Sequence, residues 1–260
     1  MLTDRRQPDR TRGVFETLLV VDGEPVLLEA HLQRLARSVE ALYSQGLPAD
    51  TAERACLAVA WLDLGKLRLT AVPAEGSVRI EVEAEEIDAG IVFPAPGVKL
   101  RTRPLDGGLG GHKWADRRGI DRPAPGEAGA LIVDEGEVLE AGWANVFAVR
   151  GGTLFTPPLD GRILPGTTRT SLLALALEGG IETREQPLRS DELLAADEVF
   201  LSGSIRGVEA ALELNGGPLA GGGPLSRRLA GALRRRWGLQ SDWGAPQASA
   251  SASIPGQLSH

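Results

Sequence analysis

A glycine-rich stretch near the middle of the 260-residue chain, Gly107-Gly108-Leu109-Gly110-Gly111, separates two runs of short predicted elements. Glycine adopts backbone conformations that other residues avoid, so this composition favours a flexible connection over a helix or a strand. The whole sequence contains 33 glycines and 17 prolines, which indicates many turns and argues against a helical bundle. We therefore expect an α+β protein of two domains, residues 1–106 and 113–238, with residues 107–112 as the linker.

The first half alternates between strand and helix patterns. Two β-prone runs, residues 14–21 and 25–29, flank Asp22-Gly23-Glu24, and an Asp-Gly pair between two such runs predicts a β-hairpin. Apolar residues at helical spacing and closing glycines predict the two helices that follow. After the hairpin we expect helices at residues 31–46 and 51–65 and strands at residues 66–72, 77–86 and 97–103.

The second half repeats this alternation. We expect strands at residues 130–134, 143–149, 152–158 and 197–204, and helices at residues 167–180, 190–196 and 225–238. From residue 239 the chain is rich in Ser, Ala, Gln and Pro, and such a composition buries too little apolar surface to order a chain. Residues 239–260 are therefore predicted to be a disordered tail.

Charge and composition exclude several function classes. The net charge of −7 and the pI near 5.2 argue against a general nucleic-acid binder, which needs a surplus of Lys and Arg. The single cysteine, Cys56, excludes an intrachain disulfide, and three scattered histidines offer little to a metal, so we expect no metal site. No apolar run is long enough to span a bilayer, and the first residues lack the apolar stretch of a secretory signal. We expect a cytoplasmic protein that does not enter a membrane.

Two ionisable residues are candidates for catalysis. Lys113 directly follows the glycine-rich stretch, and a lysine amine in an apolar setting becomes a nucleophile that forms Schiff bases. Most lysines, however, are solvated surface residues. Glu140 stands at the end of a predicted strand, where a carboxylate can lie against a ring nitrogen and keep it protonated. The alternative for Glu140 is an exposed strand end.

Three further features could bind an anion. Gly166-Thr167-Thr168 precede an amphipathic helix, and the N-terminus of a helix attracts negative charge, although a threonine can also cap a helix without a ligand. Ser202-Gly203-Ser204 follow a buried strand and could close around a phosphate or make an ordinary turn. Arg34 stands three residues after His31 on the first helix, where it could reach inward as a phosphate clamp or remain a solvated charge.

Six segments, taken in order, resemble the class IV pyridoxal-phosphate enzymes. They are GVFETLLV, LEAHLQRLARS, HKWADRR, VLEAGWANVFAV, LFTPPLDGRILPGTTRTSLL and ADEVFLSGSIRGV. The family includes branched-chain and D-amino acid aminotransferases and aminodeoxychorismate lyase, and the resemblance covers roughly residues 13–215. It implies a two-domain fold-type IV architecture, as in D-amino acid aminotransferase. It also implies pyridoxal 5′-phosphate in the cleft between the domains, and a homodimer.

The resemblance implies a role for each candidate residue. Lys113 would carry the cofactor as a Schiff base and move protons on the substrate, and Glu140 would pair with the pyridine nitrogen. The phosphate would be bound by Arg34, Thr167, Thr168 and Ser204. The candidates for substrate contact are Thr17, Arg68 and Arg206.

The segment Phe15-Glu16-Thr17 resembles aminodeoxychorismate lyase more than the aminotransferases, which show Tyr-Glu-Val or Tyr-Glu-Gly at this place. This favours a lyase that converts 4-amino-4-deoxychorismate to 4-aminobenzoate and pyruvate in folate biosynthesis, with a functional link to aminodeoxychorismate synthase. One alternative is a class IV aminotransferase acting on branched-chain or D-amino acids. The other is a catalytically inactive binding module of the same fold. The chain departs from the family pattern at Asp116-Arg117, which replaces an Asn-containing pair after the lysine.

Overall fold

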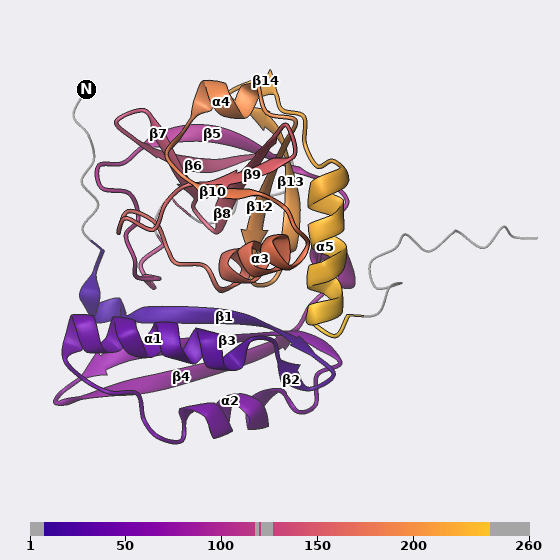
Figure 1. The fold of residues 1–260 in the computed structure, drawn as a ribbon. Helices are drawn as coiled ribbons and strands as arrows, with labels where there is room; N and C mark the ends of the chain where they lie inside the picture. Colours follow the sequence, from indigo (N-terminus) through magenta and orange to yellow (C-terminus); the bar gives the residue numbers. More distant parts are fainter. Residues whose placement is uncertain (1–7, 118–119, 121–126, 240–260) are drawn as a thin grey trace, which may run out of the picture.

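The computed structural model describes residues 8–117, 120 and 127–239. It contains two β-sheets, each with its own helices, and Figure 1 shows the smaller unit below the larger one. The mixture of helices and strands confirms the α+β class expected from the sequence.

The smaller unit is built on an antiparallel sheet in the order β2-β1-β3-β4. Its elements are η1 (Arg10–Arg12), β1 (Val14–Val21), β2 (Glu24–Pro25), α1 (Leu28–Tyr43), α2 (Thr51–Val59), β3 (Leu64–Ala74) and β4 (Ser77–Glu86). The turn residues Asp22 and Gly23 have φ angles of 49° and 78°, the left-handed backbone that joins two strands tightly, so the expected turn is confirmed. The second strand, expected at residues 25–29, is only Glu24–Pro25, and α1 already begins at Leu28.

Side chains alternate between the two faces of this sheet. Leu18 of β1 and Leu67 of β3 pack with Leu35 and Val39 of α1 in the core of the smaller unit. Because neighbouring residues of a strand point to opposite faces, the residues between them on β1 and β3 point toward the larger unit. This alternation explains why one strand can supply both a core and a wall of a cavity.

The larger unit has a ten-stranded sheet in the order β10-β9-β8-β12-β13-β5-β6-β7-β11, with β14 beside β13. The strands are β5 (Val98–Pro104), β6 (Ala128–Asp134), β7 (Glu137–Ala141), β8 (Ala144–Arg150), β9 (Thr153–Thr156), β10 (Thr183–Glu185), β11 (Leu188–Arg189), β12 (Glu198–Gly203), β13 (Gly207–Leu214) and β14 (Gly217–Pro218). Strand β7 also pairs with β8, so the path β8-β12-β13-β5-β6-β7 closes on itself as a barrel.

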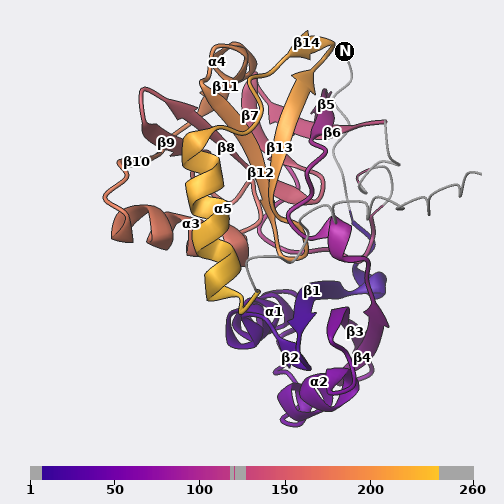
Figure 2. The same cartoon turned by 90° about the vertical axis from the view of Figure 1, so that its right-hand side faces the viewer.

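Among the described residues, four helices pack around the barrel. They are η2 (Ala89–Ile91), α3 (Thr167–Glu178), α4 (Ser190–Leu194) and α5 (Pro224–Arg236). Helices α3 and α5 lie side by side in Figures 1 and 2, against β12. Phe147 of β8 and Phe200 of β12 stack with ring centroids 5.1 Å apart and form a core with Leu172 of α3 and Leu229 of α5.

Several elements differ from those expected, and β13 has no counterpart among the expected strands. Strand β5, expected in the first domain, lies in the larger sheet because it pairs in parallel with both β13 and β6. The helix expected to end at Gly65 ends at Val59, and Gly65 lies in β3, where it pairs with Val20 and Glu86. Leu239, expected to begin the tail, is buried in the core, and residues 240–260 lie outside the described residues.

The segment after the glycine-rich stretch returns to the smaller sheet. The backbone N–H of Phe15 donates to the carbonyl of Lys113 (2.8 Å), and the N–H of Ala115 donates to the carbonyl of Gly13 (3.0 Å). These bonds fix Lys113 beside β1, at the junction of the two units.

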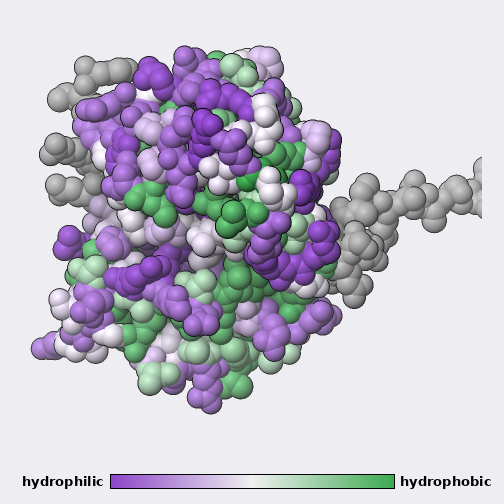
Figure 3. Space-filling view, in the orientation of Figure 1, coloured by the Kyte–Doolittle hydropathy of each residue, from purple (hydrophilic) through white to green (hydrophobic). Residues whose placement is uncertain are grey.

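Polar side chains cover most of the face shown in Figure 3, with apolar side chains gathered in smaller areas between them. Within the residues that the structure describes, none of the helices has the length and apolar character needed to cross a membrane.

Gly13 occupies a place where the backbone leaves no room for a side chain. Its φ angle is +82°, and a Cβ atom there would lie 2.1 Å from the carbonyl oxygen of Ala71. We expect Gly13→Ala to lower the free energy of unfolding by about 2–5 kcal/mol, through backbone strain and steric overlap, as measured by urea denaturation.

Gly76→Ala is the matched control. Gly76 also has a positive φ (+65°), but a Cβ atom there would meet none of the described atoms within 4 Å. Gly76→Ala should lower the free energy of unfolding through backbone strain alone, by about 1–2 kcal/mol. Equal losses in the two variants would contradict the steric explanation for Gly13.

Candidate active site

A cavity of about 360 Å³ lies between the two units. Its walls come from β1, α1 and β3 of the smaller unit, and from the β7–β8 turn, the loop before α3 and the end of β12 in the larger unit. All nine residues selected from the sequence line it: Thr17, Arg34, Arg68, Lys113, Glu140, Thr167, Thr168, Ser204 and Arg206. The fold thus brings together side chains that are far apart in the sequence.

Lys113 is partly exposed to the cavity, and its amine lies 5.1 Å from the centre of the Phe15 ring. Burial and the positive charges of Arg34 and Arg117 lower the pKa of Lys113 to about 7, although Glu16 opposes them. Much of this amine is therefore unprotonated near neutral pH. An unprotonated lysine amine is a nucleophile, and it can also accept a proton.

Glu140 is a buried carboxyl on β7 that also lines the cavity. One of its oxygens accepts a hydrogen bond from the backbone N–H of Leu164 (3.1 Å), and the other lies 3.4 Å from the side-chain amide nitrogen of Asn145. Burial raises the pKa of Glu140 to about 8, even though the Leu164 bond and the charge of Arg117 oppose this shift. A buried acid of this kind can hold a proton against a ring nitrogen.

The N-terminus of α3 forms the anion-binding end of the cavity. Gly166 is the N-cap residue, and Thr167 and Thr168 are the first residues of the helix, so their backbone N–H groups have no partner within the helix. The Thr168 hydroxyl is buried and has no hydrogen-bond partner among the described residues. Leaving a buried hydroxyl unpaired is unfavourable, so this position is suited to the polar atoms of a ligand.

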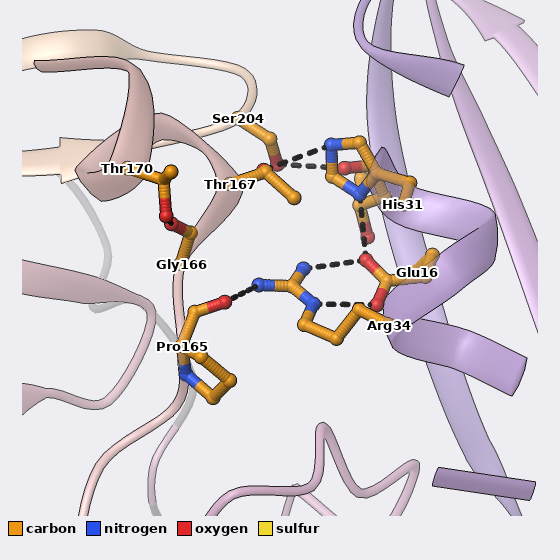
Figure 4. A network of polar contacts seen from close by, with 9 residues as sticks. Glu16, His31, Arg34, Pro165, Gly166, Thr167, Thr170 and Ser204 are labelled. Atoms are coloured by element: carbon orange, nitrogen blue, oxygen red, sulfur yellow. Dashed lines mark hydrogen bonds and ion pairs between the residues drawn. The ribbon is translucent and has the colours of Figure 1, made fainter. Parts of the chain in front are cut away.

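Arg34 lines the cavity, but its guanidinium is held by other residues of the chain. Its Nε and NH2 groups donate to the two carboxylate oxygens of Glu16 (2.7 and 2.5 Å), and NH1 donates to the carbonyl of Pro165 (2.8 Å; Figure 4). Burial by itself would raise the pKa of Glu16, but the charge and hydrogen bonds of Arg34 lower it to about 2. Arg34, expected to bind the phosphate, is therefore held by Glu16, a residue that was not assigned a role from the sequence.

Ser204 has a partner in the smaller unit. Its hydroxyl donates to the backbone carbonyl of Thr17 (2.6 Å), which joins the turn after β12 to β1. Because this bond uses the only hydroxyl hydrogen, the side chain of Ser204 cannot donate to a phosphate in this arrangement. The structure therefore places Ser204 in the cavity wall as a link between the units.

Glu16, His31 and Arg117 contribute to the site, although none of them was assigned from the sequence. Glu16 and His31 are buried, each about 1% exposed. Arg117 lines the cavity and donates to the backbone carbonyl of Gly142. A carboxylate within the apolar run VFETLLVV was the available signal for Glu16, because a buried charge requires a partner. For Arg117 we see no such signal in the sequence.

Comparison with known proteins gives consistent results. A family model described as amino-transferase class IV matches residues 13–105 and 111–213. A branched-chain-amino-acid aminotransferase from Escherichia coli is 38% identical over 105 residues, which are 40% of this chain and 34% of the relative. The matched region therefore spans about a third of that relative's length.

Two solved structures match most of the chain. The 4-amino-4-deoxychorismate lyase from Pseudomonas aeruginosa is 28% identical with a TM-score of 0.66, and the match covers 86% of this chain and 91% of the other. A hypothetical aminotransferase from Mycobacterium tuberculosis in a PLP-bound form is 26% identical with a TM-score of 0.75, covering 88% and 89% of the two chains.

The lowered pKa of Lys113 leads to a direct test in the protein freed of bound aldehydes. Only the unprotonated amine reacts with an acylating reagent, so labelling of Lys113 should rise with pH and reach half of its maximum near pH 7. Peptide mass spectrometry measures it, with the surface residue Lys99 in the same digest as the internal reference. Labelling of Lys113 that begins only above roughly pH 9, as for an ordinary lysine, would contradict the shift.

Proposed function

Since the chain belongs to the class IV aminotransferase family, we propose that it is a lyase that converts 4-amino-4-deoxychorismate to 4-aminobenzoate and pyruvate. The family uses pyridoxal 5′-phosphate, and the fold-type IV architecture expected from the sequence is confirmed by the likeness to its solved members. The observation that carries the choice of lyase is the presence of cationic side chains on the cavity wall, among them Arg68, Arg117 and Arg206, which suit a substrate with two carboxylates.

The residues around the cavity fit this cofactor. The unpaired hydroxyl of Thr168 and the N-terminus of α3 suit a phosphate, and Lys113 and Glu140 suit an aldehyde and a ring nitrogen. When bound, pyridoxal 5′-phosphate supplies an aldehyde that attaches to an amine and a ring that withdraws electrons from the neighbouring carbon.

Lys113 and Glu140 would divide the proton chemistry between them. The Nζ atom of Lys113 would hold the cofactor covalently, and with a pKa of about 7 it can take up and release a proton near neutral pH. Glu140 would hold a proton at its carboxyl against the ring nitrogen. Arg34, Thr167 and Thr168 would surround the phosphate.

The substrate would meet the part of the cavity nearest β1 and β3. The guanidinium of Arg68 stacks on the Phe15 ring, 3.9 Å from its centre, and Arg206 forms an ion pair with Glu209 (3.1 Å). Arg68 and Arg206, together with Thr17, would bind the two carboxylates. Formation of an aromatic product supplies much of the driving force, so the protein mainly has to orient the substrate and move a proton.

A class IV aminotransferase is the second candidate. Two partial matches favour it: 38% identity over 105 residues to a branched-chain-amino-acid aminotransferase, and 33% identity over 107 residues to a D-alanine aminotransferase from Bacillus licheniformis, each covering 40% of this chain. Such an enzyme would use Lys113 and Glu140 in the same way and would exchange an amino group between an amino acid and a keto acid. A catalytically inactive binding module is the third alternative, and the lowered pKa of the Lys113 amine argues against it.

The proposal includes a cytoplasmic homodimer that receives its substrate from aminodeoxychorismate synthase. The resemblance to the lyases supports the homodimer and the link to the synthase. The acidic composition, without a surplus of Lys and Arg, supports a small-molecule substrate over a nucleic acid.

A product assay separates the candidate functions. With 4-amino-4-deoxychorismate, the purified protein should form 4-aminobenzoate and pyruvate, both measured by mass spectrometry. With D-alanine or leucine and 2-oxoglutarate, it should form little glutamate. Transamination without any 4-aminobenzoate would reject the lyase and support the second candidate, and no reaction in either assay would support the third.

Two substitutions test the assigned roles. Lys113→Ala should remove the absorption band of the covalently held cofactor, at roughly 410–430 nm, and abolish turnover. Glu140→Gln should keep the band and slow turnover by roughly 10²-fold, because the amide cannot supply a proton to the ring nitrogen. Lys99→Ala, a surface variant in the larger unit, is the control and should keep both properties.

Wild-type turnover in Lys113→Ala would refute the assignment of this lysine. An unchanged rate in Glu140→Gln would remove the proposed role of the acid while leaving that of Lys113 intact.

A further inference from the structure

A chain of hydrogen bonds runs from the smaller unit to the start of α3 in the larger one (Figure 4). The Nδ1 atom of His31 lies 2.7 Å from a carboxylate oxygen of Glu16, and its Nε2 atom lies 3.1 Å from the hydroxyl of Thr167. Glu16 belongs to β1, His31 to α1 and Thr167 to α3, so three elements meet at one imidazole ring.

The direction of these bonds follows from the charge of Glu16. Its pKa of about 2 makes Glu16 a carboxylate that only accepts hydrogen bonds, so Nδ1 of His31 must carry the hydrogen. Burial lowers the pKa of His31 from its ordinary value, although Glu16 opposes this, and a lowered pKa favours the neutral ring. A neutral imidazole has one N–H, so Nε2 is an acceptor and the Thr167 hydroxyl donates to it.

Two adjacent threonines therefore differ in what they offer a ligand. The only hydroxyl hydrogen of Thr167 is used by His31. The hydroxyl of Thr168 lines the cavity and has no partner among the described residues, so its hydrogen is available. A phosphate at this end of the cavity would receive a side-chain hydrogen bond from Thr168 and backbone N–H groups from α3.

A second contact ties the same loop to the same carboxylate. Arg34, held by Glu16, donates to the carbonyl of Pro165, two residues before Thr167. Both contacts start from Glu16 and reach the chain on the two sides of Gly166, at Pro165 and Thr167, so they restrain the start of α3 more than either contact alone. A loop restrained before the ligand arrives loses less conformational entropy on binding.

We propose that Glu16 and His31 are positioning residues that act through the hydroxyl of Thr167 to hold the N-terminus of α3 ready for a phosphate group. This inference rests on the proposed function, because it assumes a phosphate-bearing cofactor at this site. Thr167 thereby becomes a link between the units, and Thr168 is the threonine whose side chain meets the ligand.

Nitrogen-15 NMR of the full chain tests the bond direction without any cofactor. The sequence has three histidines, so the imidazole signals can be assigned by substitution. At neutral pH, His31 should carry its hydrogen on Nδ1, with Nε2 as a hydrogen-bonded acceptor. Thr167→Val should shift the Nε2 signal toward that of a free lone pair, and the matched variant Thr168→Val should leave it unchanged. A hydrogen on Nε2, or a shift only in Thr168→Val, would overturn the proposal.

Calorimetric titration with pyridoxal 5′-phosphate and with inorganic phosphate tests the consequence for binding. Thr167→Val should weaken both affinities roughly two- to tenfold, and Thr167→Ser, which keeps the hydroxyl, should restore them. Unchanged affinity in Thr167→Val would overturn the positioning role.

A double-mutant cycle provides the second readout. His31→Asn keeps a donor for Glu16 but has no atom at the Nε2 position, so its loss should not add to that of Thr167→Val. Its loss should add to that of Thr168→Val, which removes a direct contact. Additive losses for positions 31 and 167 would overturn the proposal.

Failure of the proposed function gives a different result. If wild-type protein binds neither pyridoxal 5′-phosphate nor inorganic phosphate, the site does not hold a phosphate, and both the proposed function and the positioning role are lost. The NMR measurement would still report the bond between His31 and Thr167. If wild-type protein binds both probes and Thr167→Val binds them with unchanged affinity, the positioning role alone is lost.

Discussion

A buried carboxylate at the junction of the two units, that of Glu16, sets much of the arrangement around it. A charge removed from water is tolerated only where opposite charge and hydrogen bonds surround it. Arg34 supplies the charge and His31 a further hydrogen bond, and both lie on the same helix three residues apart. Arg34 then donates to Pro165 in the loop before α3, and His31 contacts Thr167, the first residue of α3. The position of the anion-binding helix end is therefore linked to the pairing of one acid on β1.

Burial also shifts the pKa values of Lys113 and Glu140, the two residues assigned to the chemistry, in opposite directions. Removal from water disfavours the charged form, so it lowers the pKa of Lys113 and raises the pKa of Glu140. Both groups consequently change protonation near neutral pH, where an acid and a base are most useful. Surrounding arginines strengthen the shift of Lys113 and limit that of Glu140. The low pKa of Glu16 shows that burial alone does not decide the result, because a bidentate arginine reverses it.

The sequence predicted the local elements well, because their signals are local. The pair Asp22-Gly23 has the backbone conformation that its turn requires, and the helix after Gly166 begins where expected. Nine residues selected with the help of the family resemblance line one cavity. Strand β5 was assigned to the wrong sheet because its partners, β13 and β6, follow it along the chain. The periodicity of a strand does not indicate which distant strand it pairs with.

The role of a hydroxyl group is harder still to predict from sequence. Thr167 and Thr168 are neighbours of the same residue type at the start of one helix, and the sequence treats them alike. They differ because Thr167 meets His31, whose tautomer is set by a carboxylate on a strand of the other unit. Which hydroxyl can donate to a ligand therefore depends on one hydrogen atom on one ring. The contact between His31 and Thr167 forms only when the two units pack together, so the sequence alone does not show it. The pairing of Glu16 with His31 is therefore part of the anion site.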